Sequence, residues 1–280
     1  MEKLLVVDGS NLLFQMFYGM PSRIIGRGGR AIQGTLGFVG ALGRIMRLVS
    51  PTHVVVLFDG EGEKERVQLD ADYKANRPDW SEVPEEDTPF SQLPDVYAAL
   101  DLVGIKHTEC TACECDDVIA AYVEEYGNER EIVISSFDSD FFQLISERVS
   151  VLRYRGDSTV VCTPEYVRSK LGVEPRQYAD YKSLVGDTSD NVKGVPRVGP
   201  KTAAALIREF DTVEGVIAGI GSVSKTAVRE SLAASVDRIR LNYRLIKLGS
   251  CAAIPFPLCE LAYERELPRT RDILTDIGAM

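Results

Sequence analysis

Residues 131–140 read EIVISSFDSD, a short β-branched apolar run that ends in two aspartates. Two earlier runs have the same form, since residues 4–8 read LLVVD and residues 54–59 read VVVLFD. Continuous apolar runs of this length are typical of strands buried on both faces of a sheet. Helix-like stretches at about 35–49 and 116–126 lie between the runs. The alternation predicts an α/β fold with a mainly parallel sheet covered by helices.

Each of these runs delivers an acid to the same edge of the predicted sheet. Asp8, Asp59 and Asp138 directly follow their strands. The carboxyl ends of parallel strands meet at one edge, where open α/β sheets place their functional crevice. Asp140 lies two residues after Asp138, and in extended geometry both side chains point to one face. We therefore expect a carboxylate site at this edge.

Further acids occur at the start of the predicted helix 116–126 and in the motif VGDTSDN. Glu114 and Asp117 are three residues apart and share a helix face, while Asp116 points to its flank. Helix capping and the helix dipole alone explain one or two acids at such a position. Asp187 and Asp190 form a second spaced pair.

Nine ionised carboxylates in one pocket would repel each other by several kcal/mol, so they need hard cations nearby. All-oxygen ligands favour Mg²⁺ or Mn²⁺ over zinc. Two such ions, roughly 4 Å apart, form a clamp for phosphodiester hydrolysis that needs no Ser, Cys or His nucleophile. The predicted metal ligands are Asp8, Asp59, Glu114, Asp116, Asp117, Asp138, Asp140, Asp187 and Asp190.

The chain divides by composition. From about residue 172 the strand signal fades and helical patterns broken by Gly and Pro follow. Residues 60–89 hold ten acids and little apolar periodicity, which is typical of an exposed functional excursion. The predicted parts are an α/β core (1–171) with an excursion (61–100), a helical region (172–250) and a C-terminal tail (251–280).

Residues 185–203 read VGDTSDNVKGVPRVGPKTA, which predicts a hairpin at 186–203. Its Gly and Pro residues make a tight turn before a helix that starts near Lys201. Backbone N–H groups at a helix N-terminus, with a lysine beside them, bind phosphate without reading base sequence. A plain interhelical turn is the alternative interpretation.

The combination of motifs resembles the 5′ nuclease family, which includes bacterial and phage flap endonucleases and the 5′-to-3′ exonuclease domain of bacterial DNA polymerase I. The resemblance runs from about Glu2 to Gly249. Besides the hairpin, the motifs that carry it are Asp8-Gly-Ser-Asn, Phe58-Asp59-Gly, Tyr73-Lys74-Ala-Asn-Arg77-Pro, Glu114-Cys-Asp116-Asp117, Asp138-Ser-Asp140 and Gly186-Asp187-Thr-Ser-Asp190-Asn.

The resemblance implies a PIN-like core with two divalent metals, an arch over them and a helix-hairpin-helix module that grips duplex DNA. It implies a structure-selective 5′ nuclease that cuts flaps, nicks or 5′ ends in replication and repair, with Lys74 and Arg77 as catalytic arch-base residues. The implied DNA contacts are Tyr73, Lys74, Arg77, Gly194, Val195, Arg197, Gly199 and Lys201. Family hairpins also hold a monovalent cation, often potassium, which points to Ser189, Val195 and Val198. The expected partners are DNA and a DNA polymerase, with the nuclease itself a monomer.

Three departures from the family pattern are informative. The arch segment is acidic from Glu82 to Asp87, whereas an arch that threads single-stranded DNA would favour a basic lining. Gln15 stands where the family often has an arginine that contacts phosphate. Arg197 replaces the first glycine of the usual Pro-Gly-Val-Gly turn, so the backbone is less free to adopt a positive φ. The added charge of Arg197 would compensate through a phosphate contact.

Other function classes fit fewer of these features. A PIN-domain ribonuclease shares the acids and the core but usually has neither hairpin nor arch, and a DNA-junction binder without activity would not retain so repulsive a cluster. A phosphatase or sugar transferase would rest on the Asp138-Ser-Asp140 motif alone. The pattern HxxCxxCxC at 107–115 is a weak zinc or iron–sulfur signal.

The composition bounds the class of protein. The 280 residues carry 32 Lys and Arg against 42 Asp and Glu, a net charge of −10, which taken alone argues against a general nucleic-acid binder. The sequence shows neither a signal peptide nor a transmembrane span. We therefore expect a cytoplasmic, standalone nuclease.

Overall fold

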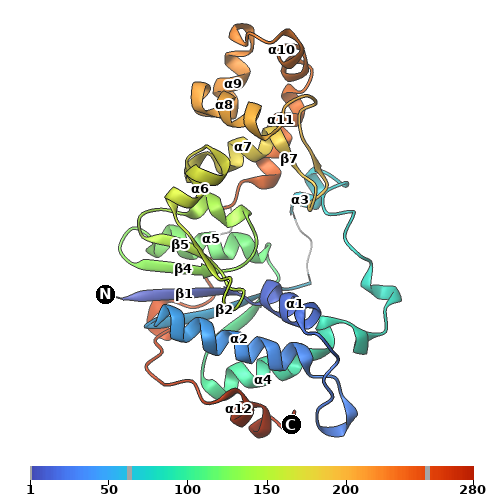
Figure 1. Ribbon diagram of the computed structural model, residues 1–280, viewed down its shortest axis with the longest axis vertical. Coiled ribbons are helices and arrows are strands. Elements are labelled where there is room, and N and C mark those ends of the chain that lie inside the picture. The colour runs from blue at the N-terminus through green and yellow to red at the C-terminus, as the bar shows by residue number, and fades with distance from the viewer. Residues whose placement is uncertain (1, 62–64, 250–252) are drawn as a thin grey trace.

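The computed structural model describes residues 2–61, 65–249 and 253–280 of the chain. A six-stranded sheet organises its lower half, with the strand order β3-β2-β1-β4-β5-β6 (Figure 1). The first five strands run parallel, and β6 pairs antiparallel with β5. The strands are β1 (Lys3–Asp8), β2 (His53–Asp59), β3 (Lys106–Cys110), β4 (Glu131–Ser135), β5 (Val149–Arg153) and β6 (Val160–Cys162). The predicted mainly parallel sheet is confirmed.

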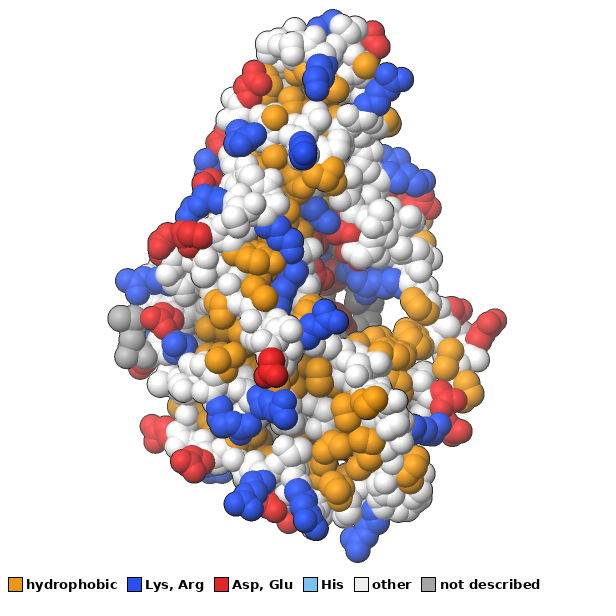
Figure 2. All heavy atoms as spheres, in the orientation of Figure 1, with side chains coloured by type: hydrophobic (Ala, Val, Ile, Leu, Met, Phe, Trp, Pro, Cys, Tyr) orange, Lys and Arg blue, Asp and Glu red, His pale blue; other side chains and the backbone are white. Residues whose placement is uncertain are grey.

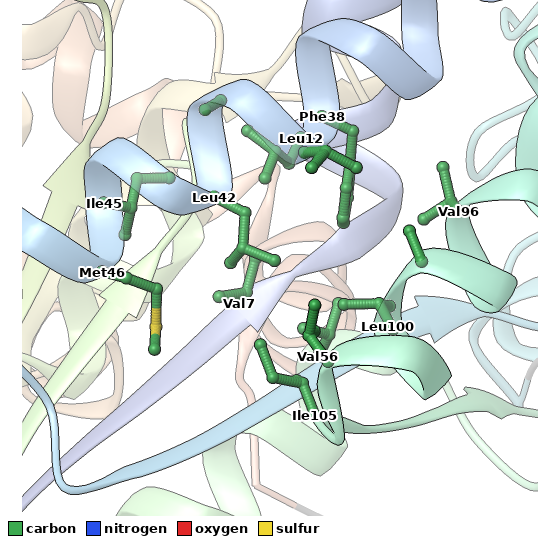
Figure 3. Packing of buried hydrophobic residues seen from close by; sticks show 14 of the residues in the cluster. Val7, Leu12, Phe38, Leu42, Ile45, Met46, Val56, Val96, Leu100 and Ile105 are labelled. Atoms are coloured by element: carbon green, nitrogen blue, oxygen red, sulfur yellow. The ribbon is translucent and has the colours of Figure 1, made fainter. Parts of the chain in front are cut away.

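Alternate residues of the central strands face two different layers of helices. Leu5 and Val7 of β1 pack with Val56 of β2 in a cluster that includes α1, α2, α4 and α12. Figure 3 shows Val7 and Val56 among side chains of α2 and α4. Leu4 and Val6 pack on the other face against α5. These helices are α1 (Gly9–Gly19), α2 (Gln33–Val49), α4 (Leu93–Val103), α5 (Cys115–Tyr126) and α12 (Thr270–Asp276).

A second, helical part lies above the sheet in Figure 1. It has its own apolar core, in which α7 packs against α8 and α11. A two-stranded antiparallel pair, β7 (Gly186–Asp187) and β8 (Val192–Lys193), lies between α7 and α8. The helices are α6 (Pro164–Leu171), α7 (Tyr178–Val185), α8 (Pro200–Phe210), α9 (Val213–Ala218), α10 (Thr226–Ala233) and α11 (Val236–Ile246). The predicted helical region is therefore present.

The excursion, here residues 65–92, links α3 (Glu65–Leu69) to α4 along the right side of Figure 1. Between them the chain forms hydrogen-bonded turns at 71–76 and short 3₁₀ turns at 80–82, 85–87 and 89–92. The predicted excursion ran to residue 100, whereas the structure ends it earlier, because Val96 and Leu100 are buried in α4 against the sheet. Residues 62–64 lie outside the described part.

The predicted tail returns to the core. Its α12 packs against α2 and α4, with Ile273 and Leu274 buried, and Ala262 forms a bridge to His53 of β2. Residues 250–252, at the start of that tail, lie outside the described part. In the stretches that the structure does describe, no helix combines the length and apolar character needed to cross a membrane.

Candidate active site

Three neighbouring parallel strands end beside one another at the edge predicted to carry the site. Asp8 is the last residue of β1, Asp59 is the last residue of β2, and Asp138 follows β4 by three residues. Because β2, β1 and β4 are adjacent in the sheet, their carboxyl ends share this edge. With Asp116 these acids form a group that we call the inner acids.

Asp8 is fixed by hydrogen bonds on both of its oxygens. It caps α1 by accepting from the N–H of Asn11 (3.0 Å), and Ser136 Oγ donates to its Oδ2 (2.8 Å). Burial raises the pKa of Asp8 to about 7, and the charges of Asp59 and Asp138 add to the increase. These two hydrogen bonds lower the pKa and only partly offset the increase. An added cation would therefore find Asp8 already positioned.

Asp116 lies in the first turn of α5 and faces the other inner acids. Burial raises its pKa well above the usual range, and repulsion from Asp138, Asp8 and Asp59 raises it further. The nearby Lys74 partly offsets this. Mutual repulsion of this kind is the signature of carboxylates that share one site.

Three further acids, Asp140, Asp187 and Asp190, lie next to Asp138; we call them the outer acids. Burial raises the pKa of Asp140 to about 8, with repulsion from Asp138 next in size. The N–H of Asp140 donates to Asp138 Oδ1 (2.7 Å), and Tyr178 donates from its hydroxyl to Asp140 Oδ1 (3.2 Å). Burial also raises the pKa of Asp138, and the charge of Asp190 raises it further. The two groups of acids therefore meet at Asp138.

Asp187 is held differently from the other outer acids. Burial alone would raise its pKa, but hydrogen bonds from Lys182 and Ser189 outweigh burial and lower it. Lys182 Nζ lies 2.6 Å from Asp187 Oδ2, and the Ser189 N–H donates to Oδ1 (2.9 Å). The side chain of Lys182 thus already contacts this end of the site.

Glu114 and Asp117 contact cations of the excursion. Both oxygens of Asp117 accept from the guanidinium of Arg66, at 2.7 and 2.8 Å. Glu114 Oε2 accepts from Lys74 Nζ at 2.8 Å and lies 3.2 Å from Arg66 Nη1. The charges of neighbouring acids raise the pKa of Asp8, Asp116, Asp138 and Asp140. The charge of Asp117 is not among the main contributions to any of these increases. The structure therefore separates Asp117 from the inner acids with which it was predicted.

The turn of residues 72–77, which we call the arch-base turn, docks on the loop between β7 and β8. Lys74 donates its backbone N–H to Asp190 O (3.0 Å), and Asn76 donates to Thr188 O (3.0 Å). Arg77 Nη2 lies 3.2 Å from Asp190 Oδ1, and Tyr73 is buried beneath the turn. The structure thus brings the predicted residues Tyr73, Lys74 and Arg77 to the rim of the acids.

Figure 2 shows the surface hollowed between the upper helical part and the excursion, with acidic and basic side chains close together in and beside the hollow. Among the described residues, no three Asp, Glu, His or Cys side chains are placed to chelate one ion directly. The zinc alternative has no support there either, because Cys110 and Cys115 are buried free thiols in the core beside α5.

The hairpin forms where the sequence predicted it. Gly199 precedes α8, and Arg197 has a φ of +65°. Arg197 and Lys201 are exposed at the turn, whereas Val195 and Val198 are buried and joined by a backbone hydrogen bond of 3.1 Å.

The glycines of the hairpin meet a second requirement, which is close approach of two backbones. A β-carbon on Gly194 would lie 2.1 Å from Val185 O, and one on Gly186 would lie 2.4 Å from Gly194 N. Ser189, a predicted cation ligand, belongs to the β7–β8 loop and donates to Asp187, so it stands with the outer acids.

Four residues of the site were not identified from the sequence: Arg66, Ser136, Tyr178 and Lys182. Arg66 lies on α3, Ser136 directly follows β4, and Tyr178 and Lys182 both lie on α7. Arg66 reaches Asp117 across 51 residues of sequence. Ser136 and Lys182 are close in sequence to acids, since Ser136 Oγ accepts the N–H of Asp138 (3.0 Å) and Lys182 pairs with Asp187. Arg66 and Tyr178 depend on tertiary contacts that spacing does not reveal.

Comparisons with known proteins bear on the family and on the fold. Residues 3–172 match a family described as 5′-3′ exonuclease, N-terminal resolvase-like domain, and residues 173–268 match one described as 5′-3′ exonuclease, C-terminal SAM fold. A 5′-3′ exonuclease of Aquifex aeolicus is 34% identical over 249 residues, which cover 89% of this chain and 82% of that protein.

Longer relatives and solved structures extend the comparison. DNA polymerase I of Lactococcus lactis is 31% identical over 265 residues, which cover 92% of this chain but only 30% of the polymerase. A bacteriophage T5 flap endonuclease, solved with DNA and metal ions, has a TM-score of 0.71 at 21% identity and covers 99% of this chain and 98% of its own. A T5 5′-exonuclease with bound zinc has a TM-score of 0.72 at 23% identity, covering 88% and 89%. These structures establish the shared fold.

Proposed function

The chain belongs to the 5′-3′ exonuclease family, and on that basis we propose that it hydrolyses DNA phosphodiesters at 5′ flaps, nicks or 5′ ends with divalent metal ions. One observation carries the proposal. Asp8, Asp59 and Asp116 belong to three separate elements and Asp138 follows a fourth, and the charges of Asp59 and Asp138 raise the pKa of both Asp8 and Asp116 at a single sheet edge. A role in folding alone would not assemble so repulsive a group.

The donor set fits hard divalent cations. Carboxylates with a pKa of about 7 and about 8, at Asp8 and Asp140, need a compensating positive charge to be fully ionised at neutral pH. We propose Mg²⁺, with Mn²⁺ as a substitute, and two ions. The inner acids would hold one ion, and Asp138 with the outer acids would hold the other. Because Mg²⁺ keeps several of its waters, direct chelation by three side chains is not required.

The residues around the acids set the geometry of the reaction. Bound metal ions would supply a hydroxide nucleophile and charge stabilisation of the leaving oxygen. Ser136 and Asn11 orient the oxygens of Asp8, and Lys182 orients Asp187. Tyr178 holds Asp140 by a hydrogen bond. Such fixed partners keep ligand oxygens in place when no substrate is bound.

Lys74 and Arg77 are the proposed phosphate contacts. Burial lowers the pKa of Lys74, but the charges of Glu114, Asp190 and Asp116 outweigh this and raise it, so the ammonium stays charged. In the DNA-free protein, carboxylates of Glu114 and Asp190 hold these two cations. We propose that both exchange a carboxylate for the scissile phosphate when DNA binds, which stabilises charge on the transition state.

The hairpin is the proposed grip on duplex DNA. Exposed Arg197 and Lys201 and the N-terminus of α8, an eleven-residue helix, present cations and N–H donors that suit phosphates without regard to base sequence. A potassium ion at the carbonyl groups of Val195 and Val198 remains a prediction, as does a contribution from Ser189.

Cleavage of a 5′-labelled flapped duplex tests the function. We expect cuts near the junction with Mg²⁺ or Mn²⁺, none with EDTA, and none with Asp116→Asn in either metal. Asp276→Asn, an exposed acid at the end of α12, is the control and should cut like wild type. Faster cleavage of RNA flaps than of DNA flaps would instead support a ribonuclease. Flap binding without cleavage in either metal would contradict the nuclease.

A DNA polymerase is the proposed functional partner, since the DNA polymerase I relatives match this chain over only about 30% of their length. Nick translation by a separate polymerase, with and without this nuclease, tests the pairing. An unchanged rate and product length would contradict it.

A further inference from the structure

Arg66 is a buried arginine, 6% exposed, in the short helix α3 where the excursion begins. Its guanidinium forms a bidentate pair with the carboxylate of Asp117 on α5, with hydrogen bonds of 2.7 and 2.8 Å. The same guanidinium donates to Lys247 O, just after α11 (3.1 Å). It therefore joins three segments: the start of the excursion, the helix that carries Asp116, and the end of the helical region.

Asp117 completes the junction from its own side. Besides Arg66, it accepts the N–H of Gly249 at 3.3 Å, and it is only 4% exposed. A guanidinium occupies both oxygens in the geometry in which arginine and carboxylate pair best. A metal ion at these oxygens would have to share the carboxylate with the guanidinium, whose like charge opposes it in this buried setting.

The junction continues to the proposed phosphate contact. Arg66 Nη1 and Lys74 Nζ approach the same oxygen of Glu114, Oε2, at 3.2 and 2.8 Å. The Tyr73 hydroxyl lies 3.4 Å from that oxygen. Glu114 is itself buried, so its position depends on the cations around it. Displacement of Arg66 would therefore move Glu114, and the position of Glu114 in turn determines the position of the Lys74 ammonium.

From this arrangement we propose that Arg66 and Asp117 form a positioning pair, the Arg66–Asp117 tie, which fastens the arch base to the core and holds Lys74 at the catalytic edge. Asp117 then acts without ligating metal. The proposal rests on the proposed nuclease function, because the role of Lys74 belongs to that function. Asp117, one of the nine predicted metal ligands, then belongs to the support of the arch, and Arg66 has a role that the sequence did not indicate.

Two measurements on the whole 280-residue chain separate positioning from metal ligation. The first is Mn²⁺ binding without DNA, followed by calorimetry, for wild type, Asp117→Asn and Asp116→Asn. We expect Asp117→Asn to keep the wild-type number of bound ions and their affinity, and Asp116→Asn to lose affinity. Loss of one bound ion in Asp117→Asn would show that Asp117 is a ligand and overturn the proposal. This measurement gives an answer even if the protein cuts no DNA.

The second measurement is flap cleavage at saturating Mg²⁺. We expect Arg66→Met and Asp117→Asn to lose about 100-fold in kcat, the typical effect of a misplaced catalytic group, while KM stays nearly constant. Arg66→Lys should recover part of kcat, because it keeps a charge beside Glu114. The control is Arg238→Met, which removes a partly exposed pair (3.7 Å to Asp70) between α11 and the residue after α3 and should cut like wild type. An unchanged kcat in Arg66→Met would overturn the proposal.

A double variant separates position from stability. Arg66→Met with Asp117→Leu replaces the buried ion pair by apolar groups, a change that often preserves the fold. If this variant melts like wild type yet keeps the low kcat, the tie acts by positioning. If its kcat returns to the wild-type value with its melting temperature, the pair is only structural and the proposal fails. A wild-type protein that cuts nothing would contradict the proposed function, and the Mn²⁺ measurement would still decide the role of Asp117.

Discussion

Arg197→Gly should make this protein more stable and at the same time weaken its hold on DNA. Arg197 has a φ of +65° in the hairpin turn, a conformation that costs a residue with a β-carbon about 1–2 kcal/mol. Glycine removes that cost, but it adds freedom to the unfolded chain worth about 0.4–1 kcal/mol. The expected net gain in the free energy of unfolding is about 0.5–1 kcal/mol. Urea denaturation monitored by circular dichroism measures it.

The loss of the charge acts on DNA binding. If Arg197 contacts one phosphate, its removal makes the slope of log K against log salt concentration shallower by about 0.9 on a flapped duplex. Binding should weaken to a similar degree on flaps of different sequence, because phosphate contacts carry no base information. Fluorescence anisotropy between 50 and 300 mM salt, in Ca²⁺ to prevent cleavage, gives both quantities.

Two further variants at the same position separate strain from charge. Arg197→Ala keeps a β-carbon at positive φ and removes the charge, so we expect the shallower salt slope without the gain in stability. Arg197→Lys should resemble wild type in both measurements. If Arg197→Gly is no more stable than Arg197→Ala, the strain argument is refuted. If both variants keep the wild-type slope, Arg197 does not contact phosphate.

Three other perturbations have directions that follow from the structure. Gly194→Ala would place a β-carbon 2.1 Å from Val185 O and should cost at least about 1–3 kcal/mol in urea denaturation, whereas Gly221→Ala, where a β-carbon would meet nothing within 4 Å, should cost much less. Without metal, the free energy of unfolding should fall as pH rises from about 4 to 8, because the folded protein holds protons on Asp8 (pKa about 7) and Asp140 (pKa about 8) that the unfolded chain has released. Denaturation in EDTA at several pH values tests this, and saturating Mg²⁺ should weaken the pH dependence. Lys74→Ala should lower kcat by about 10²–10³-fold and leave Mn²⁺ binding intact; a loss of bound ions instead would place Lys74 in the metal site.

The sheet edge could be predicted from the sequence because it follows from a rule of topology. Three buried apolar runs, each followed by an acid and separated by helical stretches, form adjacent parallel strands whose carboxyl ends meet. The strands themselves therefore place Asp8 beside Asp59, and Asp138 follows three residues beyond β4. The hairpin could also be predicted from the sequence, because the close approach of two backbone segments requires glycine at Gly186 and Gly194. In both places a local pattern determines a local geometry.

The partners of Glu114 and Asp117 could not be predicted in this way. Their spacing correctly indicated one shared helix face, with Asp116 directed elsewhere, and the structure shows Arg66 on that face. Nothing in the spacing says whether such a face meets a metal or an arginine. Arg66 belongs to a stretch without apolar periodicity, so its burial depends on α5 and the end of α11, which pack around it from distant parts of the sequence. Neither hydrophobic periodicity nor a sequence motif reveals a pair whose two residues are so far apart in the sequence.

The acidic part of the excursion makes physical sense once its two anchors are considered. The Arg66–Asp117 tie fixes the first end. At the other end Trp80 packs edge-on against Phe14 and Phe90, with ring centroids 5.9 and 6.0 Å apart. Phe14 lies on α1, the helix that Asp8 caps, so both ends of the excursion are fastened to elements that carry the acids. The acids at 82–87 lie between Trp80 and Phe90, and Asp87 contacts Arg23 at 2.9 Å. An exposed pair of that kind contributes little, about 0–1 kcal/mol, so the packed anchors, and not these exposed charges, fix the ends of the excursion.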